Sequence, residues 1–308
     1  MPWHETPTEL ERAFAERPVI VPAPEGDLVG IFTPPAPAAP PAGICVLVLS
    51  RPRFEHHRMA VAGARRLATY GFASFRLDYH GWGESEGEVP VVDLDLPYRE
   101  DVLAVIDYLR TQMGQRRFVL WGSCFDARTA ISVFEDAGSA IDGLAFIAAP
   151  VTTVATSDVY NWSNALRLGF DAARWRELIF SDRARHRAIR ALKLTFGHSV
   201  GKAFNGQFLS LSPVFEAHFK ALVRSHARAL FLYGLEDEEY RSFRVAEEHL
   251  IARLDPSTRC RFEIALWPGK VHTVLRVDRQ DEILAKVVSW ITSLHPNLAG
   301  DGEALAKA

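Results

Sequence analysis

A cysteine, an aspartate and a histidine, each following a predicted strand, are the residues of this chain best suited to chemistry. Cys124 lies in "FVLWGSCFDARTA" (118–130), where an apolar run ends at Gly122 and helix-forming residues follow. Asp237 lies in "LYGLEDEEY" and His272 lies in "WPGKVHTVL". Ligands of a parallel sheet gather at the carboxyl ends of its strands. We therefore expect these three side chains to meet at one edge of a sheet.

The chemistry predicted for this trio is nucleophilic catalysis by Cys124. A side chain at a strand-to-helix turn projects away from the backbone, and the amides at the helix N-terminus point toward negative charge. The same field favours a thiolate, as does a neighbouring imidazole. His272 would be the general base and acid, and Asp237 would orient its ring. Ser123 is the alternative nucleophile, although its side chain would be aimed differently.

The elements that must position these residues alternate between short apolar strands and amphipathic helices, which is typical of βαβ units in a mostly parallel sheet. Strands are predicted over residues 18–23, 28–33, 44–50, 72–79, 117–122, 144–150, 228–234 and 259–267. The first two flank the turn signal "APEGD" and predict an antiparallel hairpin. Helices are predicted over 58–70, 98–112, 126–137, 243–253 and 279–294.

One segment interrupts this alternation. Residues 151–226 contain aromatic and Arg-rich helical pieces and a Gly/Asn/Ser-rich bend, without a clear strand. We expect a helical cap or lid there, inserted between the two parts of the core, 1–150 and 227–295, with a flexible tail over 296–308. The Arg-rich pieces are interpreted either as a solvated helix face or as an anion-binding lid.

Composition excludes several classes of protein. The 308 residues are 48% apolar, which is enough for a large core, and the net charge of -3 comes with no long basic run, so we expect no nucleic-acid partner. No apolar window approaches the roughly 18 residues of a membrane helix, so no membrane segment is predicted. Three widely spaced cysteines fit a reducing compartment, and we expect a cytoplasmic protein. The pattern predicts no metal site and no cofactor.

The order nucleophile, acid, histidine on this alternation of elements resembles the α/β-hydrolase family, and the resemblance covers nearly the whole chain. On that frame "GSCFD" is the nucleophile elbow, with Cys124 as nucleophile and Asp126 where a small residue is usual. "LDYHGWGESEG" (77–87) resembles the D-x-x-G-x-G-x-S loop of many members, and with "SRPRFEHHR" (50–58) it is similar to bacterial exosortase-associated hydrolases. The resemblance implies an α/β-hydrolase fold with a mostly parallel eight-stranded sheet, flanking helices and a helical lid.

Several acids compete for the role of orienting the histidine. The loop of Asp237 also holds Glu236, Glu238 and Glu239. We predict Asp237 because it lies three residues beyond Gly234, as in the G-x-x-D of the family. Asp158, which follows the strand predicted over 144–150, is the alternative.

The resemblance also implies an oxyanion hole with two N–H donors. The amide of Phe125, directly after the nucleophile, would be the first. The second would come from the loop after strand 44–50, which reads S-R-P-R where many hydrolases read H-G-x. Pro52 has no N–H, so Arg51 or Arg53 must supply the amide, and we favour Arg53. Asp126 would disfavour a thiolate unless it turns toward Arg128 or another cation.

These features favour acyl transfer to water, in which an ester, lactone or thioester is cleaved through an acyl-cysteine intermediate. The substrate would be a small acyl ester or thioester, free or bound to a carrier protein. Three residues on loops near the predicted pocket are expected to contact it: Arg51, His57 and His80.

Three alternatives remain open at this point. An alcohol or amine acceptor competing with water would make the protein an acyltransferase or a cyclising thioesterase. Elimination of an acyloxy group, with His272 as base, would make it a lyase. The altered elbow and H-G-x loop also fit a non-catalytic binding protein on a hydrolase scaffold.

Overall fold

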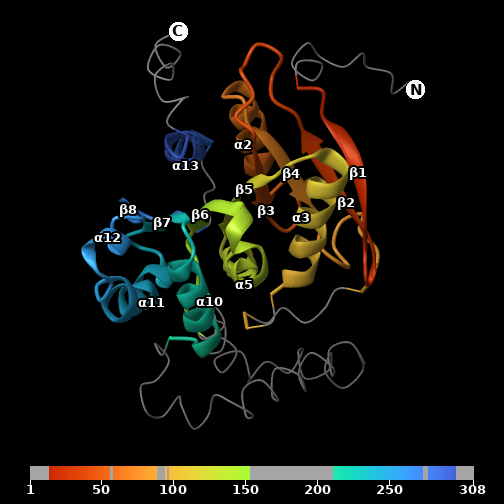
Figure 1. Ribbon diagram of the computed structural model, residues 1–308. Helices are drawn as coiled ribbons and strands as arrows, with labels where there is room; N and C mark the ends of the chain where they lie inside the picture. The colour runs from red at the N-terminus through yellow and green to blue at the C-terminus, as the bar shows by residue number, and fades with distance from the viewer. Residues whose placement is uncertain are drawn as a thin grey trace, which may run out of the picture.

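The computed structural model describes residues 14–55, 58–88, 94–95, 97–152, 211–272 and 277–295. An eight-stranded sheet of order β1-β2-β4-β3-β5-β6-β7-β8 forms its centre (Figure 1). The strands are β1 (Arg17–Ala23), β2 (Gly26–Thr33), β3 (Ile44–Leu49), β4 (Ala73–Leu77), β5 (Arg117–Ser123), β6 (Ile141–Ile147), β7 (Arg228–Gly234) and β8 (Phe262–Trp267). All eight predicted strands are confirmed, and the arrangement is that of an α/β-hydrolase.

The direction of the strands follows the sequence pattern. β1 and β2 form the predicted antiparallel hairpin, and β2 also pairs antiparallel with β4. The strands from β3 to β8 are paired in parallel. All six residues of β3 are buried, because helices cover both faces of the sheet there, and this explains why its sequence is apolar throughout.

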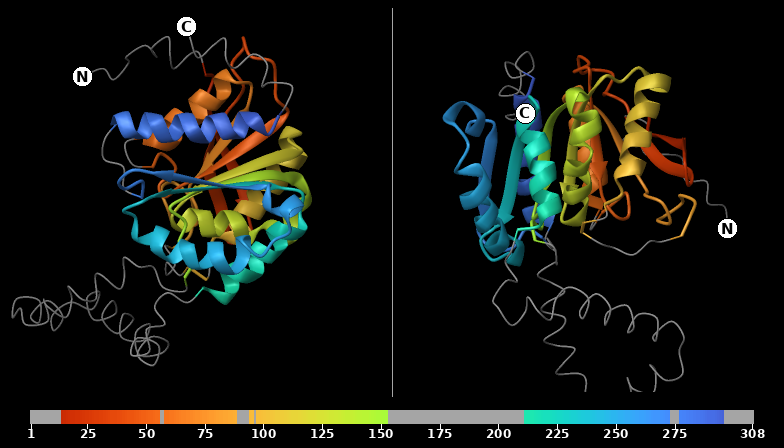
Figure 2. Two further views of the ribbon diagram at one scale, coloured as in Figure 1. Left: turned by 90° about the vertical axis from the view of Figure 1, so that its left-hand side faces the viewer. Right: turned by 60° about the horizontal axis from the view of Figure 1, so that its bottom comes forward.

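Helices form a layer on each face of the sheet. Figure 2 shows α2 and α13 across one face, and α4, α10 and α11 across the other. The helices are α2 (Met59–Thr69), α3 (Arg99–Met113), α4 (Phe125–Ser132), α5 (Phe134–Ala137), α10 (Pro213–Arg224), α11 (Glu238–Ala246), α12 (Pro256–Arg259) and α13 (Val277–Ser293), with shorter turns η2 (Gly138–Ala140) and η4 (Glu247–Ile251). In the part of the chain described here, none of them is long and apolar enough to cross a membrane.

Two helices differ from their predicted bounds in ways that matter for the site. The helix predicted over 126–137 is divided at Val133 into α4 and α5. The helix predicted over 243–253 begins earlier, because Asp237 is the N-cap residue of α11. Glu238 and Glu239 thus lie in the first turn of α11, where negative side chains interact favourably with the helix dipole.

The last part of the segment expected to form the lid belongs to the helix layer. α10 packs against α4 and α5, and it buries Phe215, Phe219 and Leu222. Its start is fixed by Ser212, whose hydroxyl accepts a hydrogen bond from the amide of Phe215 at 3.1 Å. The rest of the expected lid, from 153 to 210, and the expected tail over 296–308 lie outside the described residues.

Arg128 joins the two points where this segment leaves and re-enters the core. Its guanidinium donates to the carbonyl oxygens of Pro150 and Thr152, at 3.3 and 3.4 Å. It also donates to Asp95 at 2.5 Å and to the hydroxyl of Ser212 at 3.1 Å. The Arg128 side chain is 1% exposed, so these partners replace the water that the cation has lost.

Candidate active site

The turn between β5 and α4 presents Cys124 at its tip. Cys124 has φ 52° and ψ -119°, a conformation that L residues rarely adopt, and its amide donates to the carbonyl of Ile147 at 2.8 Å. A Cβ atom at Gly122 would lie 2.6 Å from the backbone of Asp126, so only glycine fits this tight approach. The Ser123 hydroxyl is buried beneath the turn, whereas the side chain of Cys124 is partly exposed. The elbow is therefore centred on Cys124.

His272 lies between Cys124 and an acid, but that acid is Glu239. The Nδ1 atom of His272 is 3.1 Å from Oε1 of Glu239, whose side chain is 4% exposed. Hydrogen bonds with the Cys124 sulfur and then with Glu239 raise the pKa of His272 from 6.5 to about 11, against the effect of burial. Burial pushes the pKa of Glu239 upward, but the bond with His272 and its charge bring the pKa of Glu239 below 4.5. The contacts with Cys124 and Glu239 therefore favour the protonated form of the ring.

Asp237, predicted to orient the ring, instead holds the backbone beside it. Its carboxylate accepts from the amides of Gly234 at 2.7 Å, Val271 at 3.1 Å and His272 at 3.2 Å. The predicted contact between Asp237 and the ring is therefore corrected. The physical reason is the early start of α11, which leaves Asp237 to the backbone of the neighbouring loop and brings Glu239 to the ring. Asp158 lies outside the described residues.

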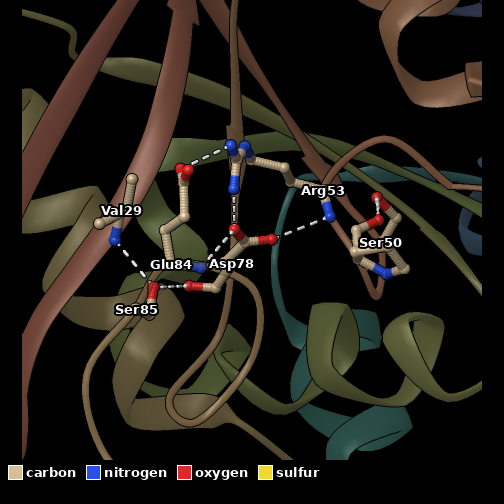
Figure 3. A network of polar contacts seen from close by, with 7 residues as sticks. Val29, Ser50, Arg53, Asp78, Glu84 and Ser85 are labelled. Carbon is tan, nitrogen blue, oxygen red and sulfur yellow. Dashed lines mark hydrogen bonds and ion pairs between the residues drawn. The ribbon is translucent and has the colours of Figure 1, made fainter.

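The predicted oxyanion donors have different outcomes. Phe125 is the first residue of α4, where amides have no partner within the helix, so the geometry permits its predicted role. Arg53, the favoured second donor, gives its amide to Oδ1 of Asp78 at 3.0 Å (Figure 3). Its guanidinium also pairs with Asp78, and with Glu84 at 2.7 Å. The prediction that Arg53 is the second oxyanion donor is therefore corrected, because its N–H is already bonded to the buried Asp78. Of the two amides considered for this role, only that of Arg51 remains a candidate.

Asp126 turns toward a cation, and that cation is Arg51 rather than Arg128. The Nε atom of Arg51 lies 3.2 Å from Oδ1 of Asp126. The guanidinium stacks on the ring of Phe125, 4.0 Å from its centroid, and lies 5.6 Å from that of Trp82. Burial raises the pKa of Asp126 to about 6, although Arg51 opposes the change. Arg51 is consequently fixed by Phe125 and Asp126, the two residues that follow Cys124.

The histidines expected to contact substrate do not join this group. His80 is 6% exposed and donates its amide to Asp101 at 2.8 Å, while its ring Nδ1 is 3.3 Å from the same carboxylate. It ties the 77–87 loop to α3, so the expectation of a substrate contact is corrected for His80. His57 and its neighbour His56 lie outside the described residues.

One residue of the site, Glu55, was not singled out from the sequence, where nothing distinguishes it from a surface acid. It lines a cavity of about 10 Å³ with Met59, Ser123, Ile147, Val271, His272 and Gln280. Within the described ranges, no group of three His, Cys, Asp or Glu side chains is arranged to hold a metal ion.

Comparisons with known proteins agree with this architecture. The sequence profile of the family described as serine aminopeptidase, S33, matches residues 41–275. A search of curated proteins found no match. Among solved structures, an esterase from Pyrococcus furiosus has a TM-score of 0.58 at 13% identity, covering 96% of each chain. A proline iminopeptidase from Mycobacterium smegmatis has a TM-score of 0.56 at 16% identity, covering 92% of this chain and 99% of that one. A serine hydrolase without a lid from Xanthomonas campestris reaches 0.53 at 16% identity, covering 89% and 94%.

Proposed function

Because the chain belongs to the serine aminopeptidase S33 family and is an α/β-hydrolase, we propose that it is an acyl hydrolase in which Cys124 replaces the serine nucleophile. Its substrate is an ester, lactone or thioester. The observation that carries the proposal is the position of His272, hydrogen-bonded to Cys124 on one side and to Glu239 on the other. A nucleophile, a base and an orienting acid in that order form the arrangement that acyl transfer requires.

In the first half of the reaction, the Cys124 thiolate attacks the substrate carbonyl carbon and a carbon–sulfur bond forms. The negative charge passes to the carbonyl oxygen, where the amide of Phe125 and an amide of the loop after β3 stabilise it. His272 then gives its proton to the departing alkoxide or thiolate as the bond to the leaving group breaks. An acyl-cysteine remains, and the alcohol or thiol leaves.

In the second half, water takes the place of the leaving group. His272 accepts a proton from the water as its oxygen attacks the acyl-cysteine, and Glu239 stabilises the resulting imidazolium. The tetrahedral intermediate collapses, the carbon–sulfur bond breaks, and the carboxylic acid departs while His272 and Cys124 return to their starting state. Since the intermediate is itself a thioester, a thioester substrate is exchanged at little cost in free energy.

Two further elements of the proposal rest on the sequence. The three cysteines, Cys45, Cys124 and Cys260, are free thiols, which supports the cytoplasmic compartment expected from their spacing. The closer relation to exosortase-associated hydrolases rests on the motifs over 50–58 and 77–87.

The experiment that tests the proposal combines trapping with substitution at the elbow. The protein is incubated with p-nitrophenyl acetate and with a simple acetyl thioester, quenched in acid, and the intact mass and the modified peptide are determined. We expect an acetyl adduct on Cys124 and no turnover by Cys124→Ala. Cys124→Ser should keep weak activity, because a hydroxyl needs fuller help from the base than a thiolate does.

Ser123→Ala is the matched control, since it changes the neighbouring residue of the same turn. It should retain most of the activity. Full turnover by Cys124→Ala, or loss of turnover in Ser123→Ala with an adduct absent from Cys124, would refute the assignment of the nucleophile.

A further inference from the structure

The loop that follows β3, residues 50–53, is held from two sides by two buried carboxylates. On one side, Nε of Arg51 lies 3.2 Å from Oδ1 of Asp126 in α4. On the other side, Arg53 bonds to Asp78, which follows β4, through its amide at 3.0 Å and also through its guanidinium (Figure 3). Each cation of this loop is therefore paired with an acid of a different neighbouring element.

Asp78 is itself fixed to the edge of the sheet. Its amide donates to the carbonyl of Val29 in β2 at 2.9 Å, and its carbonyl accepts from the hydroxyl of Ser85 at 2.6 Å. Its carboxylate is fully buried and also accepts from the amide of Glu84 at 3.2 Å. Gly83 has a positive φ of 56°, and a Cβ atom there would overlap this carboxylate. The chain after β4 is thus shaped to close around Asp78.

The two carboxylates together set the position of the Arg51 amide. Within the ranges that the structure describes, this amide has no hydrogen-bond partner. The Arg51 guanidinium lies 4.0 Å from the centroid of the Phe125 ring, so the two residues considered as oxyanion donors are in contact. Asp126 holds the end of the Arg51 side chain, and Asp78 holds the backbone two residues further along, at Arg53.

The bond to Asp78 is the stronger of the two that the Arg53 guanidinium makes. The Asp78 side chain is fully buried, whereas that of Glu84, 2.7 Å from the same guanidinium, is 67% exposed. An exposed ion pair contributes little, but a buried carboxylate that loses its cation is left with an uncompensated charge. The position of Arg53 therefore depends mainly on Asp78.

We propose that Asp78 is a positioning residue for acyl transfer, because by holding Arg53 it keeps the amide of Arg51 in place as the second oxyanion donor. The inference rests on the proposed function, in which an amide of this loop stabilises the charge on the carbonyl oxygen. Loss of one oxyanion donor lowers kcat by about 10²- to 10³-fold, which sets the upper limit of the effect.

The test compares kcat and KM for p-nitrophenyl acetate among the wild type, Asp78→Asn, Arg53→Met and the double variant. Asparagine keeps an oxygen for the Arg53 amide but carries no charge, and methionine removes the guanidinium but keeps the amide. We expect each single variant to lose about tenfold to hundredfold in kcat. KM should stay within about threefold, because both halves of the reaction pass through an oxyanion and slow together. The double variant should match the slower single variant within about threefold, since the same ion pair is broken in all three.

Two further measurements separate positioning of the donor from other effects. Glu84→Gln removes the exposed acid from the same guanidinium, so this matched control should lose less than about threefold in kcat. Alkylation of Cys124 by iodoacetamide needs no oxyanion donor, and its rate should change less than about threefold in every variant.

Three outcomes would overturn the inference: wild-type kcat in Asp78→Asn, additive losses in the double variant, or alkylation that falls in parallel with kcat. If Asp78→Asn does not fold, Arg53→Met decides alone, because its site is 20% exposed, and wild-type kcat in that variant would overturn the inference. Each of these outcomes leaves the nucleophile assignment standing as long as Cys124→Ala is inactive and the acetyl adduct forms on Cys124. Activity in Cys124→Ala would instead refute the proposed function, so the two failures are distinguishable.

Discussion

Replacing Glu239 by Gln should remove the carboxylate that pairs with Nδ1 of the His272 ring while leaving the fold intact. The Glu239 carboxylate lies 3.1 Å from Nδ1 of His272 and is almost fully buried. Glutamine occupies nearly the same volume and can still accept one hydrogen bond through its carbonyl oxygen. The substitution therefore removes the charge and changes little else.

The size of the effect follows from Coulomb's law. At 3.1 Å and an effective dielectric constant of about 20, two unit charges attract by about 5 kcal/mol. The His272 side chain is 29% exposed, so solvent screening reduces this by about half, to about 2–3 kcal/mol. Each 1.36 kcal/mol corresponds to a factor of ten in rate, so kcat/KM should fall by about 10²-fold in Glu239→Gln.

Asp237→Asn gives the contrasting case within the same segment. Its carboxylate accepts three backbone amides, and an asparagine cannot accept all of them, so the change should cost about 1–3 kcal/mol of folding stability. We expect a lower midpoint of chemical denaturation and a smaller loss of kcat/KM than in Glu239→Gln. Nuclear magnetic resonance of the histidine ring should show a lowered pKa for His272 in Glu239→Gln only.

The opposite pattern would refute this reasoning. If Asp237→Asn lost about 10²-fold in kcat/KM with an unchanged denaturation midpoint, and Glu239→Gln remained active, the orienting acid would be Asp237 after all. An unchanged pKa of His272 in Glu239→Gln would show that the ion pair does not form in solution.

Two further predictions concern the core and the reaction course. Arg128→Met should lower the free energy of unfolding by about 3–5 kcal/mol, because it leaves the carboxylate of Asp95 and two carbonyl oxygens without their buried cation. Urea denaturation measures this change, and a loss below about 1 kcal/mol would contradict the prediction. In heavy-oxygen water, the carboxylic acid released from an ester should gain one heavy oxygen, since in the proposed mechanism water attacks the acyl-cysteine. Release of unlabelled acid without any adduct on Cys124 would favour elimination by a lyase.

The parts of the fold that could be predicted from sequence are those fixed by local pattern. β3 and β5 are apolar runs that end in turn residues, and burial on both faces of the sheet requires such runs. The turn at Cys124 was predictable for a similar reason, because Gly122 and the change from strand to helix mark it within a few residues. Its position needs no knowledge of distant contacts.

The parts that could not be predicted depend on pairs of residues far apart in the chain. The amide of Arg53 donates to Asp78, which lies 25 residues further along the chain, and no residue near Arg53 in the sequence predicts this bond. Glu239 was passed over because Asp237 matches the G-x-x-D spacing of the family, and because the acidic run was interpreted as a loop before a helix predicted to begin at 243. Placing the N-cap at Asp237 would have put Glu239 in the first turn and made it a candidate.

The acidic run after β7 thus divides two tasks between neighbouring carboxylates. Asp237 fixes the backbone that carries His272 by accepting hydrogen bonds from the amides of Val271 and His272. Glu239, two residues further along the chain, pairs with the His272 ring. A single carboxylate has too few lone pairs in the right directions to do both. Because the two tasks belong to different residues, the backbone of His272 should stay in place even when the charge of Glu239 beside its Nδ1 atom is removed. This is why the substitutions at 237 and 239 should affect different quantities, one the stability of the fold and the other the rate of acyl transfer.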